Sequence, residues 1–290
     1  MARVATWSAG SILLIVLLFS THASAQSCGT GGTKDGIKVP SAQESPTVAR
    51  ICKNGTVKGG MAPFAPHGFQ DAGGTYRGPT VEIIGPAVAN LLGVRFEVVP
   101  IGWDSVVPGL VAGRYDMITS GLTYTQERTK VIDYVLDTVA GTCYIVRKDS
   151  PIQKLDEMDA PTVRMGVFTG TSWETDLPKR FPKAKMDASV QGQGGGYRVE
   201  DVLARRIDVA PLDNVAAYAF EANFPSLRVI PPPAECLKNP DPQDRLGIGV
   251  PKGDDTFKAL VQAVVTRDKD KIDAMITKYS SPDYIKVGKE

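Results

Sequence analysis

The sequence predicts an α/β protein made of two similar lobes, and three observations lead to this. Expected strands alternate with expected helices along most of the chain, as in parallel sheets that carry helices on both faces. Two stretches, 112–120 (AGRYDMITS) and 204–212 (ARRIDVAPL), each run from a helix end through an aspartate into a strand, one in each half of the chain. The length of 290 residues, 42% of them hydrophobic, is enough for two lobes.

The first 25 residues have the composition of an export signal. Arg3 is followed by an apolar run at 11–19 and by the tripeptide ASA at 23–25. This order is typical of a cleaved secretory signal, and the apolar run is too short for a membrane span of about 20 residues. We therefore expect the mature chain to begin near Gln26 and to work in the periplasm. Lipidation at Cys28 is disfavoured, because the residues before it are a poor lipidation sequence.

The cysteines, histidines and net charge narrow the classes of function. An exported chain can form disulfides, and four cysteines allow three pairings; we favour Cys28–Cys52 with Cys143–Cys236, because the first would hold the N-terminal arm. One histidine outside the signal, His67, cannot build a multi-histidine metal site, so we expect no metal or other cofactor and treat His67 as a loop residue. A net charge of +1 without a basic block gives no sign of a nucleic-acid partner.

The first half of the chain opens with an arm at 26–46, rich in Gly, Ser, Thr and Pro, that is expected to be flexible. Apolar periodicity and stop signals then define the elements. Pro86 falls inside one expected helix and predicts a kink or a late start. In order, we expect a helix at 48–52, a strand at 56–61, a loop at 63–75, a helix at 80–92, a strand at 96–100, a helix from Asp104 or Ser105, and a strand at 114–119.

The second half repeats the alternation. After a strand within 160–168, a helix starts at Ser172, where Thr171 and Glu174 fit a capping box. The run QGQGGG at 191–196 is expected to be a flexible loop, since it lacks the Lys-Ser/Thr of a phosphate cradle. Further on we expect a helix at 199–206, a strand at 207–212, a helix at 214–222, strands at 227–230 and 246–250, and mostly helix at 256–279. Asp116 and Asp208, at the starts of the two repeated strands, are expected to stabilise turns.

The segment 120–128 (SGLTYTQER) ends in an arginine whose position needs a reason. Thr125 is suited to cap a helix, because its hydroxyl can accept a hydrogen bond from a free backbone N–H group two or three residues later. Arg128 then lies in the first turn, where the positive end of the helix dipole is unfavourable for a cation. Either Arg128 points into solvent, or it binds something negative.

Ligands of open α/β sheets bind beyond the carboxyl ends of strands, and three such places hold suitable residues. They are Gly121, Thr123 and Arg128 after the first repeat, Asp213 after the second, and Thr171 and Ser172 at the helix start after Gly170. A guanidinium suits bidentate recognition of a carboxylate, helix N–H groups add donors, and Asp213 could take an ammonium group. The pattern favours a zwitterion held between the two halves; the alternative is a plain salt bridge on a solvated face.

Over residues 51–278 the chain resembles the amino-acid-binding periplasmic solute-binding proteins, the bacterial family 3 of ABC-transporter receptors. The resemblance is carried by ICKNGTVKGGM, APFAPHGF, YRGPTVEIIGPAVANLLG, GWDSVVPGLVAGRYDMITSGLTYTQERTKVIDY, VRMGVFTGTS, RRIDVAPLD and LGIGVPKG, and DMITSGLTYTQER is its most specific part. It implies a two-lobed type 2 periplasmic-binding-protein fold. Each lobe is then a mainly parallel sheet flanked by helices, and two crossover strands, near 139–143 and 238–246, form the hinge. We accordingly expect a signal peptide at 1–25, a flexible arm at 26–46, lobe 1 at 47–139, lobe 2 at 140–245, and a return to lobe 1 with C-terminal helices at 246–290.

The resemblance also implies a role for each site residue. Arg128 would bind the ligand α-carboxylate with the amides of Thr123 and Ser172, and the Gly121 carbonyl and the Asp213 carboxylate would take the α-ammonium. Phe64 and Trp103 would sandwich the ligand side chain; the alternative for both is an ordinary core position. Met61 stands at a strand end where relatives that prefer basic amino acids often place an acid, so a basic ligand is disfavoured. The chain departs from the family pattern at 78–82 (GPTVE), at Arg206 and at 133–135 (DYV).

Two main functions follow from this pattern. The first is a binding protein, a monomer that closes on an amino acid or similar small zwitterion and delivers it to an inner-membrane ABC permease complex. The second is a periplasmic enzyme on the same scaffold that resembles cyclohexadienyl dehydratase; it needs a general acid in the cleft, for which Glu174 is the candidate, although its capping role is the simpler explanation. A third possibility is the sensing domain of a signalling receptor, which would require a separate membrane partner.

Overall fold

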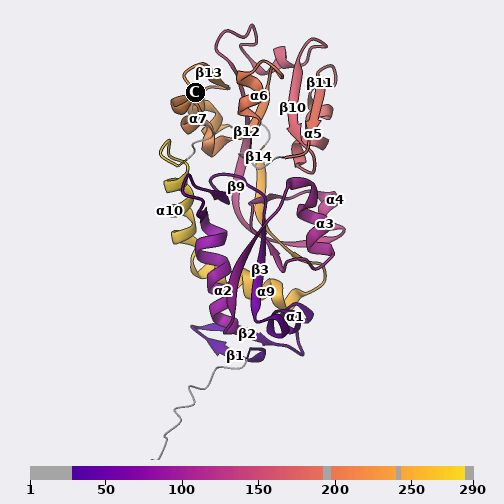
Figure 1. Cartoon of the computed structure of the whole chain (residues 1–290), viewed down its shortest axis with the longest axis vertical. Helices are drawn as coiled ribbons and strands as arrows, with labels where there is room; N and C mark the ends of the chain where they lie inside the picture. The colour runs from indigo at the N-terminus through magenta and orange to yellow at the C-terminus, as the bar shows by residue number, and fades with distance from the viewer. Residues whose placement is uncertain (1–27, 192–196, 240–242, 285–290) are drawn as a thin grey trace, which may run out of the picture.

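The computed structural model describes residues 28–191, 197–239 and 243–284. The predicted export signal at 1–25 and residues 192–196 of the Gly-rich loop lie outside these ranges. Two lobes are stacked along the long axis of the molecule, and β9 and β14 run between them (Figure 1). This is the two-lobed α/β fold expected from the sequence. Within the described ranges no helix is long and apolar enough to cross a membrane.

The lower lobe in Figure 1 is built on a parallel sheet with the strand order β6-β3-β7. Strand β3 (Thr56–Met61) lies between β6 (Arg95–Pro100) and the short β7 (Met117–Ile118). Helices α2 (Gly85–Leu92) and α9 (Asp255–Arg267) bury their apolar faces in one core with β3 and β7. The carboxyl ends of these parallel strands point toward the upper lobe, which is where the site residues of this lobe follow.

Local sequence signals explain where the helices of the lower lobe begin and end. The helix expected at 80–92 opens with a π-helical turn at Thr80–Ile84 and becomes α-helical only at Gly85, with Pro86 in its first turn. The helix therefore begins at Thr80 as expected, and Pro86 coincides with the change from π- to α-helix and not with a late start. Gly93 ends α2 in the left-handed conformation, with φ 72°, which favours glycine.

The upper lobe has a small parallel sheet of β10 (Arg164–Phe168) and β11 (Lys185–Ser189). Beside it, β12 (Ala210–Asp213) and β13 (Leu227–Ile230) pair antiparallel with β9. The helices of this lobe are α5 (Ser172–Arg180), α6 (Val199–Leu203), α7 (Ala217–Asn223) and α8 (Pro233–Lys238).

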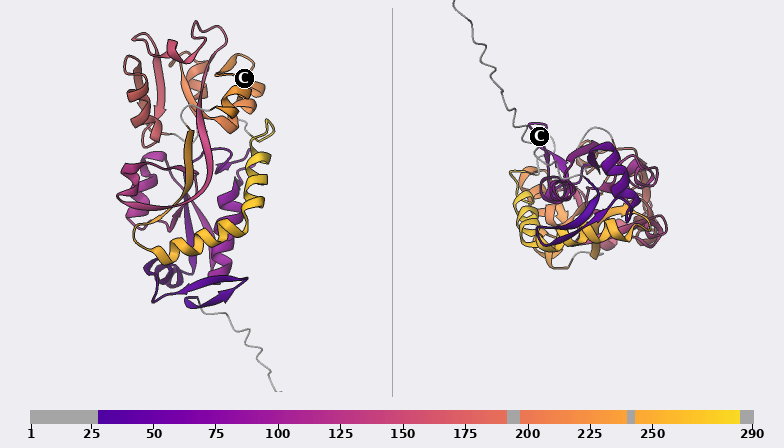
Figure 2. Two further views of the ribbon diagram at one scale, coloured as in Figure 1. Left: turned by 180° about the vertical axis from the view of Figure 1, so that it is seen from behind. Right: turned by 90° about the horizontal axis from the view of Figure 1, so that it is seen from below.

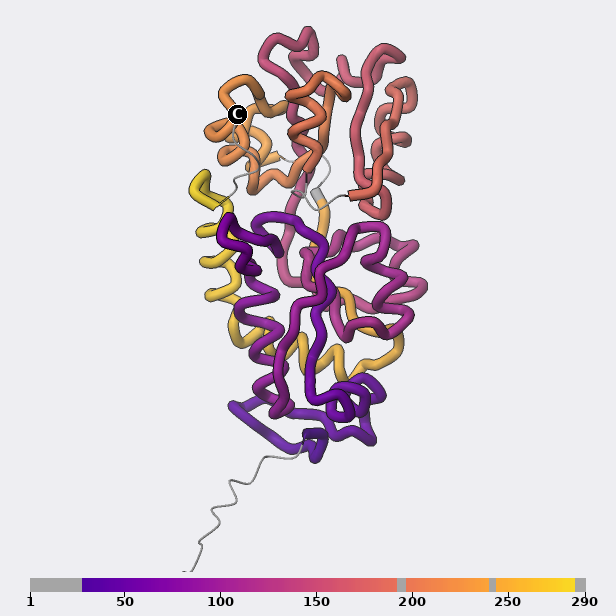
Figure 3. Tube along the Cα trace, viewed as in Figure 1, coloured from indigo at the N-terminus to yellow at the C-terminus, as the bar shows by residue number. Residues whose placement is uncertain are grey.

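Two long strands connect the lobes. Strand β9 (Ile132–Arg147) pairs with β14 (Gln243–Pro251) over its first ten residues and with β12 and β13 over its last six. Strand β9 includes the crossover expected near 139–143, and β14 covers residues 243–246 of the one expected near 238–246, of which 238 ends α8 and 240–242 lie outside the described residues. Figure 3 shows the chain passing along β9 from one lobe to the other. The register shifts between Leu246 and Gly247, which pair with Thr138 and Leu136, so Asp137 lies in a β-bulge between the lobes.

The described part of the N-terminal arm, residues 28–46, contains regular structure, which corrects the expectation of a flexible segment there. It forms a hairpin of β1 (Thr30–Lys34) and β2 (Ile37–Ser41), followed by α1 (Pro46–Asn54). Ile37 and Val39 pack into the lower core, and this burial stabilises a segment whose composition alone suggests a loop. In β2 the exposed Lys38 lies between the buried Ile37 and Val39, a local pattern that the Gly and Pro content obscured.

Both predicted disulfides are present. Cys28 pairs with Cys52 at a Cα–Cα distance of 5.3 Å, and Cys143 pairs with Cys236 at 6.2 Å, which are ordinary separations for disulfides. The first ties the hairpin segment to α1, as expected. A sulfur that is in a disulfide cannot also carry a lipid, so the first pairing argues against lipidation of Cys28.

The two repeated aspartates have matching roles. Asp116 accepts hydrogen bonds from the Lys58 backbone N–H and from the Arg50 side chain, at 2.8 to 3.0 Å. Asp208 accepts from the backbone N–H of Arg164 at 2.8 Å and from its side chain. Asp116 is thus hydrogen-bonded to β3 and Asp208 to β10, each a parallel strand of its own lobe. The two copies of the sequence repeat make the same kind of contact in the two lobes.

The C-terminal helices lie along the lower lobe. The helix expected at 256–279 breaks at Asp268 into α9 and α10 (Lys269–Tyr279), and α10 rises toward the upper lobe (Figure 2). Asn223 of α7 donates a 2.9 Å hydrogen bond to the Pro282 carbonyl, so the segment after α10 contacts the upper lobe. Other elements of the described residues are α3 (Val106–Val111), β4 (Phe69–Gln70), β5 (Tyr76–Arg77), β8 (Leu122–Thr123), α4 (Gln126–Thr129) and three short 3-10 helices, Trp103–Ser105, Leu155–Met158 and Asn214–Ala216.

Candidate functional site

Arg128 points inward and spans the two lobes. Thr125 caps α4, its hydroxyl accepting from the Arg128 backbone N–H at 3.2 Å, as the sequence predicted. The guanidinium donates from Nη1 to the Thr123 carbonyl and from Nη2 to the Gly170 carbonyl of the upper lobe, both at 2.8 Å. Burial lowers the pKa of Arg128, but a guanidinium remains charged in proteins. A half-buried cation with further N–H donors therefore lies at the boundary between the lobes.

Tyr134 fixes the carbonyl to which Arg128 binds. Its hydroxyl donates to the Thr123 carbonyl at 3.0 Å. Burial raises the pKa of Tyr134 to about 12, although the charge of Arg128 opposes this, so the hydroxyl keeps its proton and remains a donor. Thr123 thus accepts from two side chains, and this holds the guanidinium in one orientation.

The lobes approach most closely at Gly170. A Cβ atom there would overlap the Trp103 carbonyl oxygen and lie 2.6 Å from the Trp103 carbonyl carbon and 2.8 Å from the Asp104 Cα. Gly170 also has φ +87°, a conformation that favours glycine. A side chain at this position would keep the backbones of the two lobes apart.

Six of the nine predicted site residues line one pocket between the lobes. Its cavity volume is about 20 Å³, enough for a water molecule and too small for an amino acid unless the lobes move or side chains rearrange. The lining residues are Phe64, Trp103, Thr123, Arg128, Thr171, Ser172 and Trp173. Two of the three strand-end places that the sequence singled out, those of Arg128 and of Ser172, thus meet here, whereas Gly121, Asp213 and Met61 are not among the lining residues.

Four aromatic rings meet at this pocket. The ring centroid of Phe64 lies 5.7 Å from that of Trp103, 6.0 Å from Trp173 and 5.6 Å from Tyr197. Phe64 and Trp103 come from the lower lobe, and Trp173 and Tyr197 from the upper one. Burial raises the pKa of Tyr197 well above its usual range, and its protonated hydroxyl donates to the Ala65 carbonyl across the boundary at 2.9 Å. The sequence analysis missed Trp173 and Tyr197; the signal for Trp173 was its position beside Ser172.

Asp213, the residue expected to bind the ammonium group of a ligand, is paired with the His67 side chain of the lower lobe. Its Oδ1 accepts from the Val215 backbone N–H at 3.0 Å, and its Oδ2 is 3.2 Å from His67 Nε2. The side chains of His67 and Asp213 are 3% and 1% exposed. The expectation that His67 is an ordinary loop residue is wrong, because it forms a buried contact with the opposite lobe. Gly121 lies under this contact: a Cβ on it would be 2.6 Å from the His67 Cβ.

A second buried carboxylate faces this pair. Asp137, in the bulge of β9, is 6% exposed. Burial raises the pKa of Asp137 to about 6, and the nearby His67 opposes this rise. Its Oδ1 is buried and has no hydrogen-bond partner among the described residues. No metal-binding group of three or more histidine, cysteine or acidic residues occurs in the described part of the chain.

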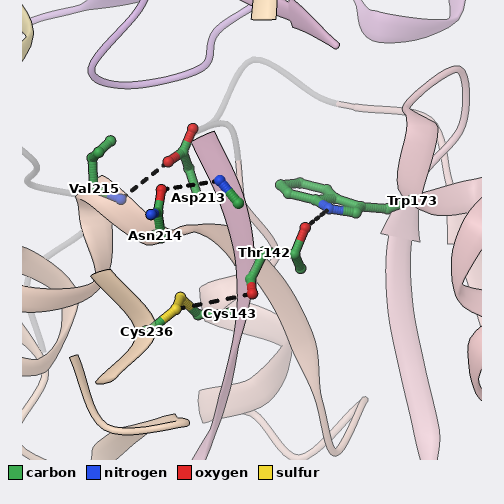
Figure 4. Close-up of a disulfide and its surroundings, with 8 residues drawn as sticks. Thr142, Cys143, Trp173, Asp213, Asn214, Val215 and Cys236 are labelled. Atoms are coloured by element: carbon green, nitrogen blue, oxygen red, sulfur yellow. Dashed lines mark hydrogen bonds between the residues drawn. A yellow bond between two sulfur atoms is a disulfide. The ribbon is translucent and has the colours of Figure 1, made fainter. Parts of the chain in front are cut away.

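The Cys143–Cys236 disulfide supports the upper-lobe side of the site (Figure 4). Thr142, next to it on β9, accepts a 2.9 Å hydrogen bond from Trp173 Nε1. Thr142 also pairs across the sheet with Asp213. Asn214 follows on and accepts from the Gly141 backbone N–H at 3.1 Å. The disulfide is therefore one residue from the positions that hold both Trp173 and Asp213.

Two further predictions concern Met61 and Glu174. Met61 is 1% exposed and packs against Gly68, where a Cβ atom added to Gly68 would lie 3.3 Å from Met61 Cγ. Met61 is not part of the pocket lining.

The capping box expected from Thr171 and Glu174 is not formed. Glu174 Oε2 accepts from the Gly170 backbone N–H at 2.8 Å, while the Thr171 hydroxyl donates to the Phe168 carbonyl. Glu174 thus stabilises the turn that brings Gly170 to Arg128.

Comparison with known proteins agrees with this geometry. Residues 57–282 match the bacterial extracellular solute-binding proteins, family 3. The L-cystine-binding protein TcyJ of Escherichia coli (strain K12) is 24% identical over 257 residues, covering 87% of this chain and 92% of that protein. The holo structure of ArgBP from T. maritima has 26% identity and a TM-score of 0.64, over 80% of this chain and 99% of that one. The ancestral amino acid-binding protein AncCDT-1, a precursor of cyclohexadienyl dehydratase, has 26% identity and a TM-score of 0.68, with coverages of 80% and 99%. The family match spans most of the chain. The chain therefore belongs to family 3 of the bacterial extracellular solute-binding proteins.

Proposed function

We propose that this protein is the periplasmic solute-binding component of an ABC importer and binds an amino acid or a related small acid between its lobes. The observation that carries the proposal is Arg128, whose guanidinium bonds to a carbonyl of each lobe inside an aromatic pocket. A half-buried planar cation with further N–H donors suits a carboxylate. The relative TcyJ is named for L-cystine binding and AncCDT-1 is described as an amino acid-binding protein, which supports the same class of solute.

The site residues are assigned by the chemistry that each offers. Arg128 binds the carboxylate of the solute, and the start of α5 at Thr171 and Ser172 adds backbone donors, as helix starts do for anions. Phe64 and Trp103 pack against the rest of the solute, together with Trp173. Met61 carries no charge, so a cationic side chain gains no ion pair from it.

Closure of the lobes couples binding to a change of shape. Arg128–Gly170 and Tyr197–Ala65 are hydrogen bonds between the lobes, and the pocket lies among them. A solute that contacts both lobes favours the closed form by its difference in affinity for the two forms. Water leaves the pocket on closure, which strengthens charged contacts. The closed protein would then dock on an inner-membrane permease.

A thermal-shift screen tests the proposal. The purified mature chain is heated with each amino acid and with related small carboxylic acids. A solute that binds only the folded state raises the melting temperature, by an amount that corresponds to about 2.7 kcal/mol at 100 times the Kd. The proposal expects at least one such solute, with a Kd near the micromolar range. No shift with any member of the screen would contradict it.

A second candidate function is supported by the likeness to AncCDT-1, which is a precursor of an enzyme. A dehydratase would need a general acid beside the pocket. Glu174 accepts a hydrogen bond from the Gly170 N–H and is not among the residues that line the pocket, so its position favours a structural role over that of an acid. Incubation with prephenate and arogenate distinguishes the two functions: an aromatic product indicates the enzyme, and saturable binding without product the receptor.

A further inference from the structure

His67 occupies the place that the family resemblance assigns to the ammonium group of the solute. That place lies between the Gly121 backbone and the Asp213 carboxylate. The imidazole Nε2 is 3.2 Å from Asp213 Oδ2, and the second oxygen of Asp213 accepts from the Val215 N–H. Both carboxylate oxygens thus have partners within the protein. An ammonium group could reach Asp213 only by displacing a buried imidazole.

The backbone around His67 holds the ring in this position. The His67 N–H donates to the Phe64 carbonyl at 2.8 Å within a tight turn, and the ring stacks on Phe64 at a centroid distance of 5.5 Å. Gly78, with φ +120°, packs against the His67 carbonyl so closely that any Cβ would overlap it. Gly121, with φ +64°, leaves room for the His67 Cβ in the same way. Two glycines from distant parts of the chain thus make space for His67.

The groups around the His67 ring are those expected around a hydrogen-bond donor. Asp213 approaches it from the upper lobe, and Asp137 faces it from the bulge of β9. A carboxylate accepts hydrogen bonds, so the contact with Asp213 places a proton on His67 Nε2. Burial raises the pKa of Asp137 and the nearby His67 opposes the rise, so Asp137 and His67 are close enough to interact. His67 therefore donates to Asp213 the hydrogen bond that an ammonium group would otherwise donate.

We propose that His67 replaces the α-ammonium group of the solute, so that the site accepts small carboxylates that lack this group. The solute carboxylate binds Arg128, and its apolar part packs on the aromatic rings of Phe64, Trp103 and Trp173. The inference rests on the proposed function for the Arg128 contact only. It changes the class of solute from a zwitterion to an apolar or aromatic monocarboxylate, and it makes His67 a specificity-determining residue.

Matched pairs of probes that differ in the ammonium group test this. The pairs are L-phenylalanine with 3-phenylpropanoate and L-leucine with 4-methylpentanoate, titrated by calorimetry into the wild-type chain, His67→Ala and His67→Gln. We expect the wild type to bind at least one probe without ammonium as tightly as its amino acid, or more tightly. His67→Ala exposes Asp213 and should shift the preference toward the amino acid by tenfold or more. His67→Gln, whose amide can still donate to Asp213, should keep the wild-type order and is the matched control.

The outcomes separate this inference from the proposed function. A wild-type protein that binds an amino acid tenfold more tightly than its partner without ammonium overturns the inference and leaves the proposed function intact. If no probe of either pair binds and the thermal-shift screen finds no solute, both the inference on His67 and the proposed function are overturned. If His67→Ala does not fold, the order of the two probes in the wild type and in His67→Gln still decides the question.

Discussion

Replacing Gly170 with alanine should hold the two lobes apart. The added Cβ would lie 2.6 Å from the Trp103 carbonyl carbon and 2.8 Å from the Asp104 Cα, and both of those atoms belong to backbone, which cannot turn away as a side chain can. The lobes must separate to remove the overlap, and the 2.8 Å bond from Arg128 to the Gly170 carbonyl is then lost. A hydrogen bond from a charged group contributes about 1.5–3 kcal/mol, so we expect the affinity for the solute found by screening to fall about ten- to a hundredfold.

Gly253→Ala is the matched control for this change. Gly253 has φ +77°, close to the +87° of Gly170, but a Cβ on it would meet nothing within 4 Å. Both variants carry the backbone cost of a left-handed alanine, about 1–2 kcal/mol of stability; only Gly170→Ala blocks closure. Calorimetry gives the affinities, and small-angle scattering with saturating solute gives the radius of gyration, which should stay larger in Gly170→Ala. If the two variants have the same affinity and the same radius, the lobes do not close at Gly170 and the reasoning is refuted.

Two other predictions concern stability. Replacing Cys143 and Cys236 by serine should lower the free energy of unfolding by about 1 kcal/mol more than replacing Cys28 and Cys52 by serine. The first disulfide closes a loop of 93 residues and the second a loop of 24, and the cost of losing a cross-link grows with loop length. Equal losses in urea unfolding would argue against this. Burial raises the pKa of Asp137 from 3.8 to about 6, so between pH 4 and pH 6 the folded state binds more protons than the unfolded state and stability falls as pH rises. Asp137→Asn removes this pH-dependent contribution. The difference in unfolding free energy between variant and wild type should therefore be more favourable to the variant at pH 7 than at pH 4, by at most about 3 kcal/mol. The same difference at both pH values would show that Asp137 is not the cause.

Much of the site could be predicted because it is encoded locally. The cap by Thr125 and the place of Arg128 in the first helical turn follow from nine consecutive residues, and the structure confirms the capping bond. The sequence repeat also singled out Asp116 and Asp208, but their hydrogen bonds join them to Lys58 and Arg164, 58 and 44 residues away, so these partners have no local signal. The cap by Thr125 joins residues three apart and does not depend on how the lobes meet.

The role of His67 could not be predicted in this way. Its position depends on Gly78 and Gly121, which make room for it, and on Asp213, 146 residues away, which binds it. A histidine in a Pro-rich loop gives no local sign of any of these contacts. Tyr197 was missed for the same reason, since its partner carbonyl lies in the other lobe.

The N-terminal hairpin shows a different limit. Its composition of Gly, Ser, Thr and Pro suggests a flexible arm, yet Ile37 and Val39 are buried in the lower core. Two well-placed apolar side chains and one disulfide were enough to order it. Composition averages over such alternation, so it underestimates short strands.

The most direct test of the carboxylate contact is calorimetry on Arg128→Ala, with Lys130→Ala as control. Lys130 is an exposed cation just past α4 that pairs with Glu127 at 2.7 Å, so its removal changes the charge nearby but not the pocket. Removing one partner of a buried charged pair costs about 2–5 kcal/mol, so the account predicts a loss of affinity of thirtyfold or more for Arg128→Ala and wild-type affinity for Lys130→Ala. Unchanged affinity in Arg128→Ala would contradict it.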